Sequence, residues 1–198
     1  MSYRVLWSSL RLVLLATVVL GLGYNLLMTG IAELAFPHQA NGSLVKYNGR
    51  VVGSSLIGQQ FTAAKFFHGR PSATTPPYNA SASSSSNLGP TNPILVKQVE
   101  HSLSKILESN PGVTRNQVPN SLIESSASGL DPDITPTGAL LQVQRVAKAN
   151  HLSVNLVRQL VLSHVQARFL WVYGHSYVNV LRLNLALEKL VGRKGIGG

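Results

Sequence analysis

Residues 12–32 read LVLLATVVLGLGYNLLMTGIA, an uncharged run between Arg11 and Glu33. At a rise of about 1.5 Å per residue, a helix of this length crosses a bilayer core of about 30 Å. Arg4 and Arg11 precede the run, and positive charge before a span favours a cytoplasmic N-terminus. We therefore expect cytoplasmic residues 1–11, a transmembrane helix over 12–32, and residues 33–198 in the periplasm or outside the cell.

A cleaved signal peptide is the alternative for this N-terminal run. Gly30-Ile31-Ala32 has the small-x-small pattern of a cleavage site, although the apolar run exceeds the usual length of about 7–15 residues. Cleavage there would release a secreted binding module that begins at Glu33. A retained anchor fits the length better, and we take it as the leading interpretation.

Three small or polar residues inside the run are candidates for packing in the membrane. Thr17 and Gly21 form a small-xxx-small pair, and Asn25 follows one turn later. Small residues at this spacing allow two helices to approach closely in lipid. We expect packing against a neighbouring helix there, and a lone anchor facing lipid on all sides is the alternative.

Composition excludes several classes of protein. The 198 residues are 44% hydrophobic, with 17 Lys+Arg, 7 Asp+Glu and no Cys. Apolar content of this size supports a folded core and excludes a purely disordered chain. The absence of Cys excludes disulfides, thiolate zinc sites and a cysteine nucleophile. The basic residues are scattered rather than gathered in a stripe, so nucleic acid is not an expected partner.

The outer part has the patterns of an α+β domain with a small sheet and about four helices. Asn48-Gly49, between two short apolar runs, predicts a hairpin with a type I′ turn. Residues 69–92 form a long loop rich in Ser, Pro and Asn, which is either disordered or a functional surface. Two short strands are expected at 170–173 and 177–178.

The four expected helices each have a start signal and an apolar face. The first follows Asn92-Pro93, and the second starts at Thr135-Pro136. The third follows Ser153, and the last covers 179–191. Their expected buried positions are, in order, Leu95, Val99, Leu103, Ile106 and Leu107; Leu140, Val143 and Ala147; Val154, Val157, Val161 and Val165; and Val180, Leu183, Leu187 and Leu190.

Catalytic motifs are missing from the sequence. The six His residues are dispersed, without HExxH or another ligand spacing, and neither a Walker motif nor a G-x-S-x-G elbow occurs. Asp131 and Asp133 are the one close carboxylate pair that suggests a cation site. A tight turn leading into the next helix explains the same pair without any ligand. The residues alone thus favour a membrane-anchored interaction domain.

Several ordered motifs resemble one family along nearly the whole chain. They are PHQANGSL at 37–44, GSSLIGQQF at 53–61, FFHGRPS at 66–72, YN at 78–79, SNL at 86–88, SASGLD at 126–131, ITP at 134–136, RVAKA at 145–149, VNV at 178–180 and LNLAL at 183–187. In this order, the motifs resemble KdpC, the family of small subunits of bacterial potassium-transporting Kdp ATPases.

The resemblance implies a non-catalytic subunit of an ATP-driven potassium uptake complex. Its implied partners are a channel-like potassium-binding subunit of the KdpA type, a P-type ATPase subunit of the KdpB type and a one-span subunit of the KdpF type. The chain itself would bind no cofactor, and ATP, magnesium and potassium would act in the complex. The expected role is to stabilise assembly.

The motifs also imply where this chain contacts its partners and nucleotide. We expect partner contacts at Gln59, Phe61, Arg70, Pro71, Ser72, Tyr78, Asn79, Asn87, Leu88, Asn179 and Asn184. Ser83, Ser84, Ser85 and Ser86 stand where the family has a Ser-Gly-Gly-Ser segment proposed to raise the ATP affinity of the ATPase subunit. Both glycines of that segment are Ser here. An alternative role is an outer potassium entrance at Asp131 and Asp133, which the basic charge of the domain disfavours.

Overall fold

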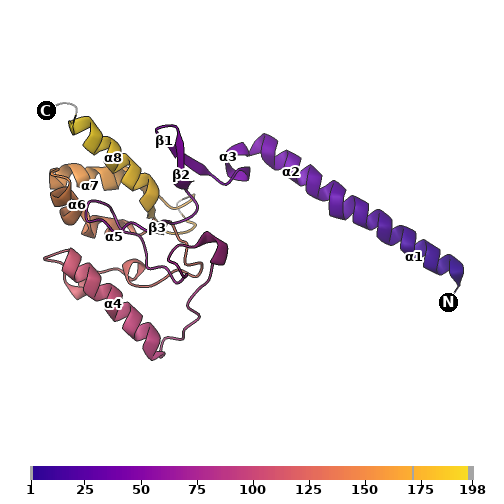
Figure 1. The fold of residues 1–198 in the computed structure, drawn as a ribbon, viewed down its shortest axis with the longest axis horizontal. Coiled ribbons are helices and arrows are strands. Elements are labelled where there is room, and N and C mark those ends of the chain that lie inside the picture. The colour runs from indigo at the N-terminus through magenta and orange to yellow at the C-terminus, as the bar shows by residue number, and fades with distance from the viewer. Residues whose placement is uncertain (1, 171, 196–198) are drawn as a thin grey trace. The chain divides into compact units, whose positions relative to one another are not determined.

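The computed structural model describes residues 2–170 and 172–195, with side chains up to Gly192 (Figure 1). The chain divides into two units, residues 1–44 and 45–198. The first unit is mainly one long apolar helix, and the second is a mixed domain of helices and small sheets. The predicted α+β class with one N-terminal apolar helix is therefore confirmed.

The N-terminal helix is continuous from Tyr3 to Ala35, and by length and composition it can cross a membrane. It consists of α1 (Tyr3–Ala16), a π-helical stretch (Thr17–Gly23) and α2 (Tyr24–Ala35). It is longer at both ends than the predicted 12–32, and the π-helical stretch was not predicted. Pro37 ends it, because the residue before a proline avoids the helical region. The short helix α3 (Pro37–Ala40) follows.

Polar side chains in this helix find their partners within it. Asn25 Nδ2 donates to the Gly21 carbonyl at 2.6 Å, and Thr29 Oγ1 donates to the Asn25 carbonyl at 2.9 Å. Such bonds to the preceding turn remove the need for water or a partner helix. Packing of Thr17, Gly21 and Asn25 against another helix thus stays a prediction.

The predicted hairpin at Asn48-Gly49 is confirmed. Strands β1 (Leu44–Tyr47) and β2 (Arg50–Ser54) pair in a two-stranded sheet. Asn48 and Gly49 between them have φ angles of +49° and +78°. Positive φ at both central positions defines a type I′ turn, which Asn-Gly adopts at low cost.

A second sheet has three short antiparallel strands in the order β3-β5-β4. They are β3 (Asp133–Ile134), β5 (Tyr177–Asn179) and β4 (Val165–Gln166). Val178 of β5 pairs with Ile134 on one side and with Val165 on the other. These side chains form an apolar row facing the helices.

The sheet departs from the sequence prediction in three places. The predicted strand at 170–173 is wrong: Phe169 and Tyr173 pair across a turn instead, and Trp171 lies outside the described residues. Val165 belongs to β4 rather than to the preceding helix, and Asp133 begins a strand. Two-residue strands are too short to show a period of two, so the sequence does not predict them.

The described part of the second unit contains five α-helices. They are α4 (Pro93–Ser109), α5 (Pro136–Leu141), α6 (Val143–Ala149), α7 (Val154–Ser163) and α8 (Val180–Gly195). Of these, α5 and α8 contact the three-stranded sheet. The predicted caps are confirmed, since Asn92, Thr135 and Ser153 accept backbone N–H groups of the first turns. The predicted second helix is two helices, α5 and α6, with Gln142 at the break.

The core lies where α7 packs against α5, α6 and α8. Its most buried side chains are Phe67, Val143, Val146, Val157, Val161, Val178, Leu183 and Leu187. Val154 was predicted to be inside but is 43% exposed. On α4, only Leu103 of the predicted face is fully buried, and the others are half-buried, which leaves this helix at the periphery.

Candidate functional site

The first half of the long loop is folded. Ser72 Oγ accepts from the Tyr78 N–H at 2.9 Å and donates to the Gly129 carbonyl at 2.7 Å. Thr74 Oγ1 accepts from the Asn79 N–H and donates to the Pro76 carbonyl. These bonds close residues 72–79 into a turn tied to a distant segment. In this part of the loop the side chains thus hold a defined turn.

Tyr78 fixes this turn to the neighbouring motifs. Its hydroxyl donates to the Arg70 carbonyl at 2.6 Å. A Cβ on Gly58 would lie 2.5 Å from the Tyr78 ring and 2.7 Å from the Asp131 carbonyl, so this close approach requires glycine. Burial raises the pKa of Tyr78 to about 12. The phenol therefore stays protonated and acts as a hydrogen-bond donor.

Arg70 and Asp131 form a half-buried ion pair beside this turn. The guanidinium contacts Asp131 Oδ2 at 2.9 Å, and the two side chains are 25% and 28% exposed. Asp131 Oδ1 accepts the Asp133 N–H at 3.0 Å. Arg70 also reaches the Glu124 and Ser125 carbonyls at 3.4–3.5 Å. Both oxygens of Asp131 are thus engaged, and its charge is balanced by Arg70.

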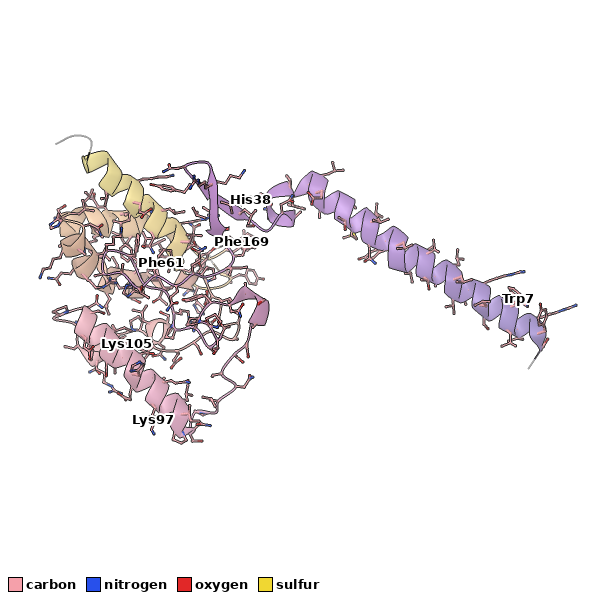
Figure 2. The ribbon with its side chains drawn as sticks, in the orientation of Figure 1. Trp7, His38, Phe61, Lys97, Lys105 and Phe169 are labelled. Carbon is pink, nitrogen blue, oxygen red and sulfur yellow. The ribbon has the colours of Figure 1, made fainter. Side chains whose placement is uncertain are left out.

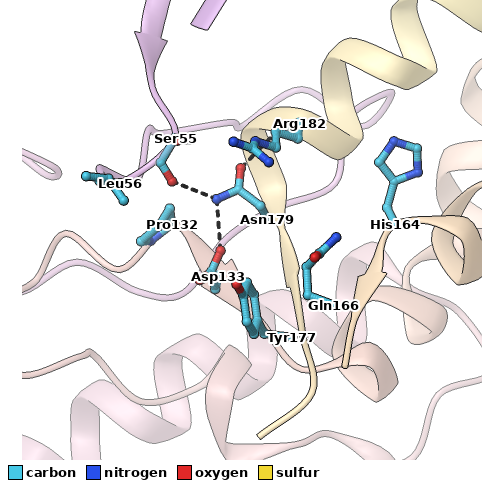
Figure 3. Close-up of a pocket in the computed structure, with 9 residues that line it drawn as sticks. All are labelled: Ser55, Leu56, Pro132, Asp133, His164, Gln166, Tyr177, Asn179 and Arg182. Atoms are coloured by element: carbon cyan, nitrogen blue, oxygen red, sulfur yellow. Dashed lines mark hydrogen bonds between the residues drawn. The ribbon is translucent and has the colours of Figure 1, made fainter. Parts of the chain in front are cut away.

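Asp133 is engaged as well, in a pocket of about 340 Å³ shown in Figure 3. Its Oδ1 accepts from Asn179 Nδ2 at 2.9 Å, and the same amide donates to the Ser55 carbonyl. Burial raises the pKa of Asp133 above its ordinary value, and the Asn179 bond partly offsets this. Among the described residues, no group of three His, Cys, Asp or Glu side chains could hold a metal ion.

Several predicted partner contacts have internal partners. Asn184 is 2% exposed, and its amide binds both the N–H and the carbonyl of Phe67. Asn179, 9% exposed, joins β5 to Ser55, and Gln59 donates to the Val52 carbonyl. Phe61, labelled in Figure 2, is half-buried. It packs edge-on against Phe66, with ring centres 5.5 Å apart. These side chains therefore contribute to the fold, and partner contact at these positions stays a prediction.

The serine run does not form an open phosphate cradle. The Ser84 N–H donates to the Ser128 carbonyl at 3.1 Å, and Ser83 Oγ donates to the same carbonyl at 3.0 Å. Ser85 Oγ donates to Asn87 Oδ1. Ser86 and Leu88 are half-buried and line a shallow pocket with Pro71 against α4. No helix begins at this run, whereas phosphate loops gain affinity from the helix that follows.

A buried polar cluster around Arg145 was missed by the sequence analysis. The guanidinium donates to the Ala64 and Phe66 carbonyls at 2.6 and 2.9 Å, and to Gln142 Oε1 and Asn110 Oδ1. Desolvation lowers its pKa to about 10. Desolvation and Arg145 together lower the pKa of His68, which keeps that ring neutral. Arg145 lay inside a quoted motif, but nothing in its spacing indicated burial.

Three motifs that are far apart in the sequence converge on one surface groove of about 600 Å³. We call it the Arg70 groove. Its lining consists of Leu56, Ile57, Arg70, Ser125, Ser126, Ala127, Ser128, Leu130, Asp131 and Pro132. Leu56 is 63% exposed and Ile57 is 36% exposed at its edge. Adjacent exposed apolar side chains make this groove a candidate surface for contact with another protein.

Comparisons with known proteins agree with the motifs. The family profile described as "KdpC: K+-transporting ATPase, c chain" matches residues 6–189. A potassium-transporting ATPase KdpC subunit of Methylobacterium nodulans is 50% identical over 189 positions, covering 89% of this chain and 92% of that protein. The KdpC subunit of Bradyrhizobium diazoefficiens is 46% identical and covers 96% of this chain and 99% of that protein.

A third relative, the KdpC subunit of Burkholderia ambifaria, is 51% identical over 173 positions, covering 87% of this chain and 89% of that protein. These matches run along both the apolar helix and the mixed domain. The chain therefore belongs to the KdpC family, the C chains of potassium-transporting ATPases.

Proposed function

We propose that this chain is a non-catalytic accessory subunit that stabilises an ATP-driven potassium uptake complex. The observation that carries the proposal is the family match over residues 6–189. The internal use of the polar motif residues supports it, because Asp131, Asp133 and Asn179 are committed to each other and to the fold. The chemistry of transport would then belong to the channel-like and P-type ATPase partners.

The long apolar helix anchors the chain in the bacterial inner membrane under this proposal. Arg4 and Arg11 near its start favour a cytoplasmic N-terminus, which places the mixed domain on the periplasmic or outer side. Thr17 and Gly21 then offer a close-packing surface to a partner helix. ATP would bind on the opposite side of the membrane, so direct nucleotide contact by Ser83–Ser86 is disfavoured.

Docking of the domain onto the channel-like subunit is assigned to the Arg70 groove. Leu56 and Ile57 supply exposed apolar area. Arg70 and Asp131 form an ion pair that lines the same groove. Deletion of the long loop, residues 69–92, cannot test this docking. That segment contains Ser72 and Tyr78, whose hydrogen bonds belong to the fold, so the deletion would unfold the domain as well. Point substitution at the exposed edge is sharper.

The test compares Leu56→Asp with Val96→Asp in a tagged full chain co-expressed with its partner subunits. Val96 is 51% exposed on α4, outside the groove, and serves as the matched control. Burial of an uncompensated charge at this apolar edge would cost about 2 kcal/mol or more, so recovery of partners should fall roughly tenfold or more for Leu56→Asp alone. Equal recovery for both variants would refute docking through the groove.

A regulatory effect on ATP affinity is a second candidate function. From the outer side it could act only by favouring one conformation of the complex, through contacts that differ between two states. ATP titration of the intact complex, with and without the groove substitution, tests it. Unchanged ATP affinity in a partly detached complex would exclude this function.

A further inference from the structure

The turn between β4 and β5 carries a strongly exposed group of apolar side chains. Four side chains stand out from it, which we call the hairpin tip: Phe169, Leu170, Val172 and Tyr173, with 72%, 64%, 74% and 68% of their surfaces exposed. Phe169 is labelled in Figure 2. The Phe169 and Tyr173 backbones pair with each other, which closes the base of the tip.

Charge around the tip is of one sign along the chain. No Asp or Glu occurs from 134 to 187, whereas Arg145, Lys148, Arg158, Arg168 and Arg182 do. Arg168 directly precedes the tip and is exposed, and His175 follows it. Arg168 therefore favours anionic headgroups next to the tip, since a basic residue near a charged membrane contributes about 1 kcal/mol.

The base of the same hairpin adds cationic and polar groups. Gln166 of β4, Tyr177 of β5 and Arg182 of α8 line one pocket together with His164 (Figure 3). Asp133 is the carboxylate of that pocket, and its Oδ1 already accepts a hydrogen bond from Asn179. The tip is thus an exposed apolar turn directly preceded by the exposed Arg168.

We propose that the hairpin tip inserts into the surface of an anionic phospholipid bilayer. Phe, Tyr and aliphatic side chains with a flanking Arg are the residues of the membrane interface. The anchors of protein interfaces, in contrast, cluster in well-packed, desolvated pockets. This inference rests on the membrane attachment proposed above.

The tether keeps the domain within reach of the bilayer. Residues 36–44 join the long helix to the first strand, and they extend to at most about 30 Å. The helical turn α3 shortens this further. A domain of this size has a radius of gyration of about 15 Å, so its surface stays close to the membrane that anchors it. The effective concentration of lipid around the domain is therefore high.

The absence of Cys allows a single-site probe. Val172→Cys and, as control, Ser104→Cys on the exposed face of α4 are each labelled with an environment-sensitive fluorophore in the full chain. The chains are reconstituted into phosphatidylcholine vesicles with or without phosphatidylglycerol. Flotation measures attachment, and quenching by spin-labelled lipid measures insertion of the label.

The expected result is quenching at position 172 but not at 104, stronger with phosphatidylglycerol and weaker in 1 M salt, where the Debye length is about 3 Å. Adding Phe169→Ser and Leu170→Asn removes two inserted side chains, each favouring insertion by roughly tenfold, and should abolish the quenching. Asn is chosen because position 170 has a φ of +50°.

A floating chain with no quenching at 172 overturns the inference and leaves the proposed function standing. A label that is shielded only when the partner subunits are present also overturns it, and assigns the tip to a protein interface. A chain that does not float overturns the proposed membrane attachment, and the inference with it. Equal quenching at 172 and 104 would mean non-specific adsorption and would likewise refute it.

Discussion

Replacing Asn184 by Ala tests the internal role of the motif residues most severely. The Asn184 amide accepts from the Phe67 N–H at 2.8 Å and donates to the Phe67 carbonyl at 2.9 Å. Both residues are buried, at 2% and 0% exposure. The substitution therefore leaves the buried N–H and carbonyl of Phe67 without the hydrogen bonds that Asn184 provides. Among the described residues, no other side chain or backbone group is hydrogen-bonded to them.

The magnitude follows from the two stranded groups. Each unsatisfied buried donor or acceptor costs about 1–3 kcal/mol, and the vacated amide volume adds a smaller amount. We expect the free energy of unfolding to fall by about 3–5 kcal/mol, a large part of the total of about 5–15 kcal/mol for an ordinary domain.

Urea unfolding of the full chain in detergent, followed by circular dichroism, measures this loss. Hydrogen exchange of the peptide containing Phe67 should show reduced protection in the same variant. Asn155→Ala on the exposed face of α7 is the matched control and should stay within about 0.5 kcal/mol of the parent chain. A loss below about 1 kcal/mol for Asn184→Ala would refute the reasoning, since it would mean that water replaces both bonds.

Three further predictions concern the neighbouring groups. The pKa of Tyr78 is raised to about 12, so its contribution to stability is complete below pH 10 and is lost as the pH rises from 10 to 12. A Tyr78→Phe chain should lack this part of the pH dependence of the unfolding free energy. An unchanged slope of the unfolding free energy against pH in this variant would count against the buried, protonated phenol. The pKa of Asp133 is raised, so ionisation of this carboxyl destabilises the fold at pH values above its ordinary pKa. Asp133→Asn should therefore raise the urea midpoint of the chain at pH 7 but not at pH 3, and should leave the potassium affinity of the assembled complex unchanged. A lowered potassium affinity of the complex would instead support the entrance role. Gly58→Ala should destabilise by about 1–3 kcal/mol, because its Cβ would meet Tyr78 and the Asp131 carbonyl; Gly89→Ala, whose Cβ meets no atom within 4 Å, is the control, and equal melting temperatures for the two would contradict the close packing.

Local signals in the sequence predicted much of the fold. Asn92, Thr135 and Ser153 cap helices because their side chains accept the free N–H groups of a first turn, which is a property of a few adjacent residues. Asn48-Gly49 set the hairpin turn for the same local reason. The break at Gln142 is different. Gln142 Oε1 accepts a hydrogen bond from the His68 N–H, 74 residues away, and no neighbouring residue in the sequence predicts that contact.

The site was less predictable than the fold. Asn179, Asn184 and Arg145 are polar, and polar residues in a short motif suggest an exposed functional surface. Their partners lie far along the chain, as with Asn184 and Phe67, 117 residues apart. Burial of such groups depends on tertiary contacts. A sequence pattern therefore cannot distinguish residues that hydrogen-bond within the fold from residues that contact a partner. The Arg70 groove became visible only when three distant motifs were brought together.

The central claim is that this chain is a membrane-anchored subunit of a potassium-transporting complex. Purification of a tagged chain from its native host in mild detergent, followed by mass spectrometry of the intact complex and its subunits, tests it directly. The account predicts an uncleaved chain that carries residues 1–32 and arrives with a channel-like subunit and a P-type ATPase. A chain that arrives alone and begins at Glu33 would contradict it, and would identify a released binding module instead.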